Sequence, residues 1–294
     1  MTQLNRISKR LKPFKYYSPT SIGEAVSLLQ EYGDRVKVLA GGTDLLCMMK
    51  LRAANPECVL GLKGIAGLSY IREEEKRLRI GALTQIAAFV EDDLVEKKYI
   101  SLHEAAVDFA TPQVRNMATI GGNICRSSPG ADMVPPLTSL GAELRLVGSK
   151  GERKVLLEDF ISGAGQNILD GEILIEIIVP PQEGRYGTAF AKLSRNSADL
   201  AKVNCAAKVI ISGPICENLC IILGAVADRP VRAKRVEGEI KGKKVSEEII
   251  KSASKEVIKE ITPITDARST AEYRLQVSQV LINRVVMQAI HRAG

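Results

Sequence analysis

The sequence has few of the residues that usually bind metal ions. It contains only two histidines, and none of its six cysteines forms a C-x-x-C pair. Cys216 and Cys220 have C-x-x-x-C spacing, but one such pair supplies at most half of a metal site. We therefore expect no metal site, and we interpret these two cysteines as small apolar residues packed around a strand.

Long apolar runs are also missing. No stretch approaches the ~18 consecutive apolar residues that would span a bilayer. The N-terminal stretch MTQLNRISKRLKPFKYY is basic and lacks the apolar segment of a secretory signal. The sequence therefore predicts a protein with no transmembrane segment that stays in the reducing cytoplasm, where its cysteines are thiols.

Aromatic residues are scarce, and this bears on the positive charge of the chain. Lys and Arg number 41 against 34 Asp and Glu, which gives a net charge of +7, while aromatic residues make up 4%. Proteins that bind single-stranded nucleic acid usually pair such charge with stacking rings, and here the basic residues are interleaved with glutamates. We expect no nucleic acid partner and favour a solvated face or a protein partner with an acidic surface.

The two commonest nucleotide-binding motifs, G-x-x-x-x-G-K-S/T and G-x-G-x-x-G, are absent, which argues against a kinase, an NTPase and an ordinary NAD-binding unit. Two other glycine pairs follow apolar strands: Gly41-Gly42 in LAGGTDLL and Gly121-Gly122 in ATIGGNICRSSPGAD. A strand ending in Gly-Gly exposes backbone N–H groups and approaches a ligand closely, which suits phosphate. Two such loops would clamp a diphosphate, with Asp132 accepting hydrogen bonds from a ribose or adenine. The alternative for Asp132 is a helix cap before Met133.

The stretch PPQEGRYG is the best linker candidate, because proline and glycine cluster there between two ordered patterns. Before it, Ser21 and Glu24 have capping-box spacing at the start of a helix that leads to the strand VKVLA. After it, TAFAKLS, KVNCAAKVIIS and NLCIILGAV predict three strands, and helices follow over about 246–260 and 270–291. The last helix is expected to start with a capping box of Ser269 and Glu272. Its apolar stripe is expected at Tyr273, Val277, Val280, Leu281 and Val285.

The segments LAGGTDLL, TIGGNICRSSPGAD, FAKLSRNSADLAKVNCA and TAEYR together resemble the FAD-binding medium subunit of the molybdenum hydroxylases, the family of aerobic carbon monoxide dehydrogenase and xanthine dehydrogenase. The resemblance covers about residues 12–291. It implies an α+β fold with a vanillyl-alcohol-oxidase-type FAD-binding domain over 1–182, made of subdomains at about 1–64 and 65–182. It also implies a C-terminal domain over 183–294 with a three-stranded antiparallel sheet and helices.

The resemblance further implies a non-covalent FAD site without catalytic side chains or metal ligands. The first loop would wrap the pyrophosphate with Leu39, Ala40, Gly41, Gly42, Thr43, Asp44, Leu45 and Leu46. The second loop would consist of Thr119, Ile120, Gly121, Gly122 and Asn123. Phe109 would lie near the dinucleotide, Asp132 would hold the adenosine part, Leu174 would line the cavity, Lys192 would reach the flavin, and Asp199 and Leu200 would border its ring. From the residues alone, Phe109 and Leu174 are equally explained as core residues, and Lys192 as a solvated strand residue.

The function that the resemblance implies is electron transfer. Electrons would pass from a large molybdenum-cofactor subunit, through a small subunit with two 2Fe-2S clusters, to FAD on this chain and then to NAD, a quinone or oxygen. The sequence shows no His-Asp or paired-carboxylate constellation, which agrees with a role that needs no general acid or base. Two alternatives stay open: an autonomous FAD-dependent oxidoreductase acting on a small substrate, and a non-catalytic dinucleotide-binding module.

Overall fold

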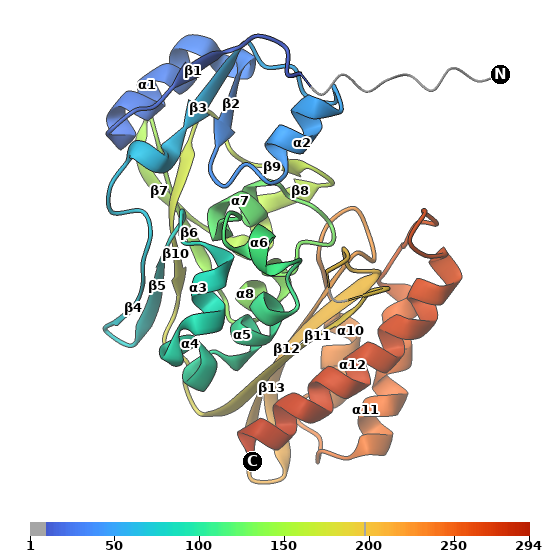
Figure 1. Cartoon of the computed structure of the whole chain (residues 1–294). Helices are drawn as coiled ribbons and strands as arrows, with labels where there is room; N and C mark the ends of the chain where they lie inside the picture. Colours follow the sequence, from blue (N-terminus) through green and yellow to red (C-terminus); the bar gives the residue numbers. More distant parts are fainter. Residues whose placement is uncertain (1–9, 197) are drawn as a thin grey trace, which may run out of the picture.

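The computed structural model describes residues 10–196 and 198–294 (Figure 1). Residues 1–9, part of the basic N-terminal stretch, and Ser197, part of the third quoted segment, lie outside the described residues. The described chain is a mixed α and β protein with a three-stranded, a five-stranded, a four-stranded and a two-stranded sheet.

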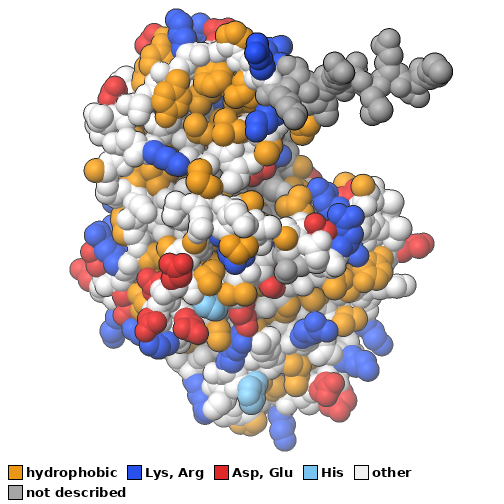
Figure 2. All heavy atoms as spheres, viewed as in Figure 1, with side chains coloured by type: hydrophobic (Ala, Val, Ile, Leu, Met, Phe, Trp, Pro, Cys, Tyr) orange, Lys and Arg blue, Asp and Glu red, His pale blue; other side chains and the backbone are white. Residues whose placement is uncertain are grey.

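The N-terminal part is a small parallel sheet with a helix on one face. The strands are β1 (Lys15–Tyr17), β2 (Val36–Leu39) and β3 (Cys58–Gly61), in the order β1-β3-β2. The predicted first helix is confirmed as α1 (Ile22–Tyr32), where the Ser21 side chain accepts from the Glu24 amide. α1 buries Ala25 and Val26 in the same apolar cluster as Cys58 and Leu60. On the face shown in Figure 2, hydrophobic side chains gather over this sheet and α2 (Leu45–Lys50).

The middle part is an antiparallel sheet with helices packed on one face. Its strands, in spatial order, are β4 (Ile71–Glu74), β5 (Arg77–Gly81), β10 (Ile173–Val179), β6 (Glu143–Gly148) and β7 (Gly151–Leu156). The helices are α3 (Ile86–Glu91), α4 (Asp93–Lys98), α5 (Ile100–Val107), α6 (Pro112–Arg115), α7 (Ile120–Cys125), α8 (Val134–Ser139) and α9 (Leu157–Phe160). A short hairpin, β8 (Ile161–Gly163) and β9 (Gln166–Asn167), follows α9. Side chains alternate along each strand, so one face of the sheet joins the helices in the largest apolar core.

The C-terminal part carries the three predicted strands as a meander of β11 (Arg185–Leu193), β12 (Val203–Ser212) and β13 (Ile215–Gly224). The sheet has four strands rather than the expected three, because β14 (Val231–Arg232) pairs with Ile222 and Leu223 of β13. Two residues are too short for a detectable alternation, so tertiary pairing alone defines this strand. The helices are α10 (Lys234–Ile240), α11 (Glu247–Ser254) and α12 (Ala271–Ala293).

The last helix differs from its prediction in two respects. Its N-cap is Thr270, whose side chain accepts from the Tyr273 amide, so the expected capping box at Ser269 is wrong. Tyr273 and Val280 of the predicted stripe are 43% and 57% exposed. Leu281 and Val285 of the stripe are buried, and the buried face of α12 also carries polar residues that the apolar pattern did not include, Arg274 and Ser278.

The C-terminal sheet lies between two layers. α12 runs along one face of β11 and β12, and α5 and α8 contact the other (Figure 1). Cys216 is fully buried in the core beneath α12, as predicted, whereas Cys220 is only partly buried. In the described part of the chain no group of His, Cys, Asp and Glu could hold a metal ion, and no helix is long and apolar enough to cross a bilayer.

Candidate functional site

The two glycine loops contact each other. A Cβ added to Gly41 would lie 2.0 Å from the Met117 carbonyl oxygen and 2.9 Å from the Ala118 Cα, immediately before Thr119. Only a residue without a side chain allows this approach. Although the two loops are far apart in the sequence, they therefore form one continuous surface.

This surface forms part of a cavity of about 1170 Å³ between the N-terminal sheet and the five-stranded sheet. That volume is larger than most small-molecule sites need. The predicted residues that line it are Leu39, Ala40, Gly41, Gly42, Thr43, Asp44, Leu45, Phe109, Thr119, Gly121, Gly122, Asn123 and Leu174. The predicted residues that do not line it are Leu46, Ile120, Asp132, Lys192, Asp199 and Leu200.

The first loop presents free backbone donors. Gly42 has a φ of +81°, which places the loop in a conformation that favours glycine. The N–H groups of residues 41–45 have no hydrogen-bond acceptor among residues 10–196 and 198–294. Clustered N–H groups facing a cavity are suited to an anion.

The second loop works differently from the prediction, because Gly121 and Gly122 belong to the first turn of α7 and not to the end of a strand. The Ile120 and Gly121 amides donate to the Thr84 and Ala82 carbonyls, both at 2.9 Å. The Gly122 amide donates to the Thr119 hydroxyl at 3.1 Å. These three amides are therefore satisfied within the protein and are not available to a ligand.

The second loop contributes side chains instead. Asn123 lines the cavity, and its Oδ1 is buried without a hydrogen-bond partner among the described residues. Arg126, at the C-cap of α7, also lines the cavity, and its Nε is likewise buried and lacks a hydrogen bond there. This Nε lies 3.7 Å from the Asp44 carboxylate of the first loop. Arg126 was not among the residues predicted to bind, although it lies within the segment TIGGNICRSSPGAD and carries the positive charge that a phosphate attracts.

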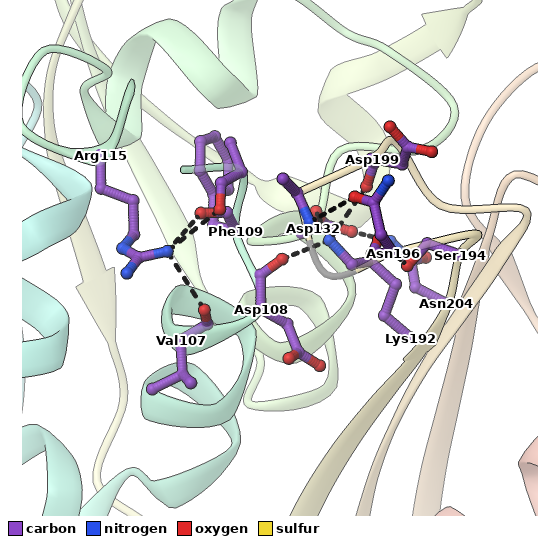
Figure 3. A network of polar contacts seen from close by, with 12 residues as sticks. Val107, Asp108, Phe109, Arg115, Asp132, Lys192, Ser194, Asn196, Asp199 and Asn204 are labelled. Carbon is purple, nitrogen blue, oxygen red and sulfur yellow. Dashed lines mark hydrogen bonds and ion pairs between the residues drawn. The ribbon is translucent and has the colours of Figure 1, made fainter. Parts of the chain in front are cut away.

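Phe109 and Leu174 satisfy both interpretations given to them, since each lines the cavity and packs against the main apolar core. The backbone beside Phe109 is held by Arg115, whose guanidinium donates to the carbonyls of Phe109 at 2.9 Å and of Ala110 at 3.1 Å (Figure 3). Ala110 has a φ of +42°, so this turn is strained and depends on such support.

Asp132 and Lys192 meet in a buried polar network where the C-terminal sheet contacts the helices (Figure 3). Lys192 Nζ is 3.1 Å from one Asp132 carboxylate oxygen, and Asn204 Nδ2 donates to the other at 2.8 Å. Lys192 also donates to the Asp108 and Asp199 carbonyls. Its side chain is 1% exposed, so the interpretation as a solvated strand residue is wrong.

The helix-cap alternative for Asp132 is also wrong. α8 has Met133 at its N-cap and no side-chain cap, because the Asp132 carboxylate is used by Asn204 and Lys192. Burial raises the pKa of Asp132 to about 6, against the opposing effects of Lys192 and Asn204. The segment from Pro129 to Asp132 thus docks on the C-terminal sheet, where Ala225 N donates to the Pro129 carbonyl at 2.6 Å.

The geometry fits a dinucleotide that carries a diphosphate. The cavity combines free N–H groups, the unsatisfied Asn123 oxygen and the Arg126 cation. The apolar side chains of Phe109 and Leu174 supply walls for aromatic rings.

Comparison with protein families gives matches along nearly the whole chain. Residues 12–182 match the FAD binding domain in molybdopterin dehydrogenase, and residues 188–289 match the CO dehydrogenase flavoprotein C-terminal domain. The carbon monoxide dehydrogenase medium chain of Hydrogenophaga pseudoflava is 35% identical over 282 residues, covering 96% of this chain and 98% of the relative. The glyceraldehyde dehydrogenase medium chain of Sulfolobus acidocaldarius is 34% identical over 269 residues, covering 91% and 95%.

Solved structures agree with these matches. The carbon monoxide dehydrogenase from Hydrogenophaga pseudoflava, in a form that lacks the Mo-pyranopterin moiety of its molybdenum cofactor, superposes with a TM-score of 0.94 at 35% identity, over 97% of this chain and 100% of that chain. The quinoline 2-oxidoreductase from Pseudomonas putida 86 gives 0.91 at 27% identity, over 97% and 99%. The resemblance seen in the sequence is confirmed. The chain belongs to the family of FAD-binding medium subunits of the molybdenum hydroxylases, so its cofactor is FAD and it is the flavoprotein subunit of a multi-subunit oxidoreductase.

Proposed function

We propose that the cavity between the two glycine loops holds FAD non-covalently, and that the chain thereby passes electrons from a partner subunit to an external acceptor. The observation that carries this proposal is that residues 41–45, whose N–H groups have no acceptor among the described residues, line a cavity of about 1170 Å³. When bound, the flavin would supply the redox chemistry. The residues of this chain bind it, orient it and shield it from water.

The binding roles follow from the donors present. The N–H groups of residues 41–45 and the Arg126 guanidinium hold the diphosphate, and Asn123 accepts from or donates to the dinucleotide. Phe109 and Leu174 pack against its rings. The FAD contacts expected for Leu46, Ile120, Asp132, Lys192, Asp199 and Leu200 stay predictions, and their positions outside the cavity lining favour indirect roles.

The electron route that we propose begins on two other chains. A large molybdenum-cofactor subunit would oxidise the substrate, and a small subunit with two 2Fe-2S clusters would carry the electrons here. NAD, a quinone or oxygen would then receive them. The relatives are medium chains and FAD-binding subunits of several dehydrogenases, which supports an assembly of this kind.

We also propose a domain division at residue 182, with an FAD-binding domain over 1–182, subdomains at about 1–64 and 65–182, and a C-terminal domain over 183–294. Three apolar clusters support this division in the main, although Phe190 and Ala206 join the middle cluster, and Ile173 and Ile175 join the N-terminal one. β10 ends at Val179 and β11 begins at Arg185, so the boundary falls in the connection between two sheets.

The first test is Gly42→Ala. Because Gly42 has a φ of +81°, a side chain costs roughly 1–2 kcal/mol of folding free energy and shifts the first loop. We expect FAD affinity, measured by fluorescence titration of the full chain, to fall at least tenfold. Gly67→Ala is the matched control, since Gly67 has a φ of +77° and lies outside the cavity. Equal FAD affinity in both variants would contradict the proposal that the first loop binds the diphosphate.

A second experiment separates the rival functions. Isolation of the native complex should yield this chain with a large molybdenum-containing and a small iron–sulfur polypeptide. Reduction of bound flavin by a small substrate, with no partner present, would favour an autonomous oxidoreductase. Protein without flavin absorbance after FAD is supplied would favour a non-catalytic module.

A further inference from the structure

Asn204 on β12 is fully buried, and its amide reaches across to the segment that follows the second glycine loop. We propose that Asn204 is a positioning residue for the FAD cavity, acting through Asp132 and Lys192 to hold the Phe109 turn and α7 in place. This inference rests on the proposed function and adds a residue that lies outside the cavity lining.

Two adjacent side chains of the C-terminal sheet donate hydrogen bonds to Asp132. Lys192 and Asn204 are cross-strand partners of β11 and β12, so their side chains leave the same face of the sheet. Nζ of Lys192 and Nδ2 of Asn204 contact different oxygens of the one carboxylate, at 3.1 and 2.8 Å (Figure 3). The carboxylate is therefore fixed in both position and rotation.

The contacts of Lys192 and Asp132 extend to residues that line the cavity. Lys192 also donates to the Asp108 carbonyl, and the next residue, Phe109, lines the cavity. Arg115 holds the Phe109 carbonyl from the other side. Asp132 is also connected to the cavity lining along the chain, because it ends the segment that starts at Arg126, another lining residue. Movement of Asp132 would thus disturb the wall at two places.

The orientation of the Asn204 amide is forced by its surroundings. Its Oδ1 is buried without a partner among the described residues, next to Gly224, where an added Cβ would lie 2.2 Å from that oxygen. Rotating the amide by half a turn would place Oδ1 against the Asp132 carboxylate, and two acceptors repel. Gly224 therefore leaves room for the one rotamer that donates to Asp132.

The charge of Asp132 depends on this donor. Burial raises its pKa to about 6, Lys192 and Asn204 lower it, and Asp108 raises it. Removing the Asn204 donor therefore raises the pKa further. Because Lys192 pairs with the ionised carboxylate, the Lys192–Asp132 ion pair is present above this pKa and is lost as the pH falls through it.

The test uses the full chain with FAD and the variants Asn204→Leu, Asn204→Asp and Gly224→Ala. Asn204→Asp keeps the size of the side chain and replaces the donor with an oxygen that cannot donate when ionised. The Cβ added in Gly224→Ala would meet the Asn204 oxygen and also the Pro129 carbonyl oxygen, at 2.9 Å. We expect these variants to weaken FAD binding about tenfold, because the cavity wall is no longer held in its binding conformation before FAD enters. The acid limb of the FAD affinity against pH should move to higher pH, and the visible circular dichroism of bound flavin should change. Gly130→Ala is the control: it lies in the same docked segment, and its added Cβ would meet nothing closer than 3.6 Å.

The outcomes are distinct. Wild-type FAD affinity and an unmoved pH profile in Gly224→Ala, or in a folded Asn204→Leu, would overturn the inference even if the melting temperature falls. A wild-type chain that binds no FAD would overturn the proposed function and this inference with it. If Asn204→Leu does not fold, Asn204→Asp decides, because Gly224→Ala also displaces the Pro129 carbonyl directly.

Discussion

At the scale of single residues, Arg126 is the most informative member of the cavity. Its guanidinium spans from α7 toward Asp44 of the first loop, at a distance too long for a strong ion pair. Nearby, the N–H groups of residues 41–45 also lack acceptors among the described residues. An anion between the two loops would satisfy both sets of donors, whereas the Asp44 carboxylate satisfies neither.

Arg126→Met is therefore expected to weaken FAD binding by about tenfold or more, the effect of losing a charge-assisted hydrogen bond. The remaining affinity should depend less on salt. Riboflavin, which lacks the diphosphate, should bind the variant and the wild type equally, as measured by fluorescence titration. Arg77→Met, at an exposed residue of β5, is the control. An equal loss of riboflavin affinity would place Arg126 at the flavin ring instead.

At the scale of elements, α7 shows how a short helix depends on its cap. Thr119 is 4% exposed and accepts from the Gly122 amide, so removal of its hydroxyl leaves a partly buried N–H without its acceptor. Thr119→Val should lower the free energy of unfolding by about 1–2 kcal/mol, measured by urea denaturation. Thr111→Val removes the longer cap of α6, at 3.4 Å, from a half-buried site. Its effect should be smaller, and the opposite ranking would contradict this account of α7.

At the scale of the whole molecule, Glu104 of α5 joins the helices to the C-terminal part. Its carboxylate accepts from the Phe190 amide of β11 at 2.8 Å and pairs with Arg292 of α12. Glu104→Ala should cost about 2 kcal/mol or more and broaden the calorimetric unfolding transition, because a buried amide and a cation lose their partner together. The control Glu73→Ala breaks an exposed pair with Lys98, which should cost less than about 1 kcal/mol. Equal losses in the two variants would show that Glu104 does not join the helices to the C-terminal part.

The amino-acid sequence by itself determined the features that depend on neighbours along the chain. The α1 cap at Ser21, the strand before Gly41 and the β11–β13 meander all follow from local spacing and turn residues. The order of the quoted segments was also enough to identify the family and its FAD.

Only the tertiary structure decided what depends on residues far apart in the chain. It placed Gly121 against Ala82, so that the second loop gives the cavity side chains rather than free backbone N–H groups. It also paired Asp132 with Lys192 and Asn204, and it added β14 to the sheet. A short motif specifies which groups a segment can offer, but whether those groups stay free depends on partners that only folding brings within hydrogen-bond distance.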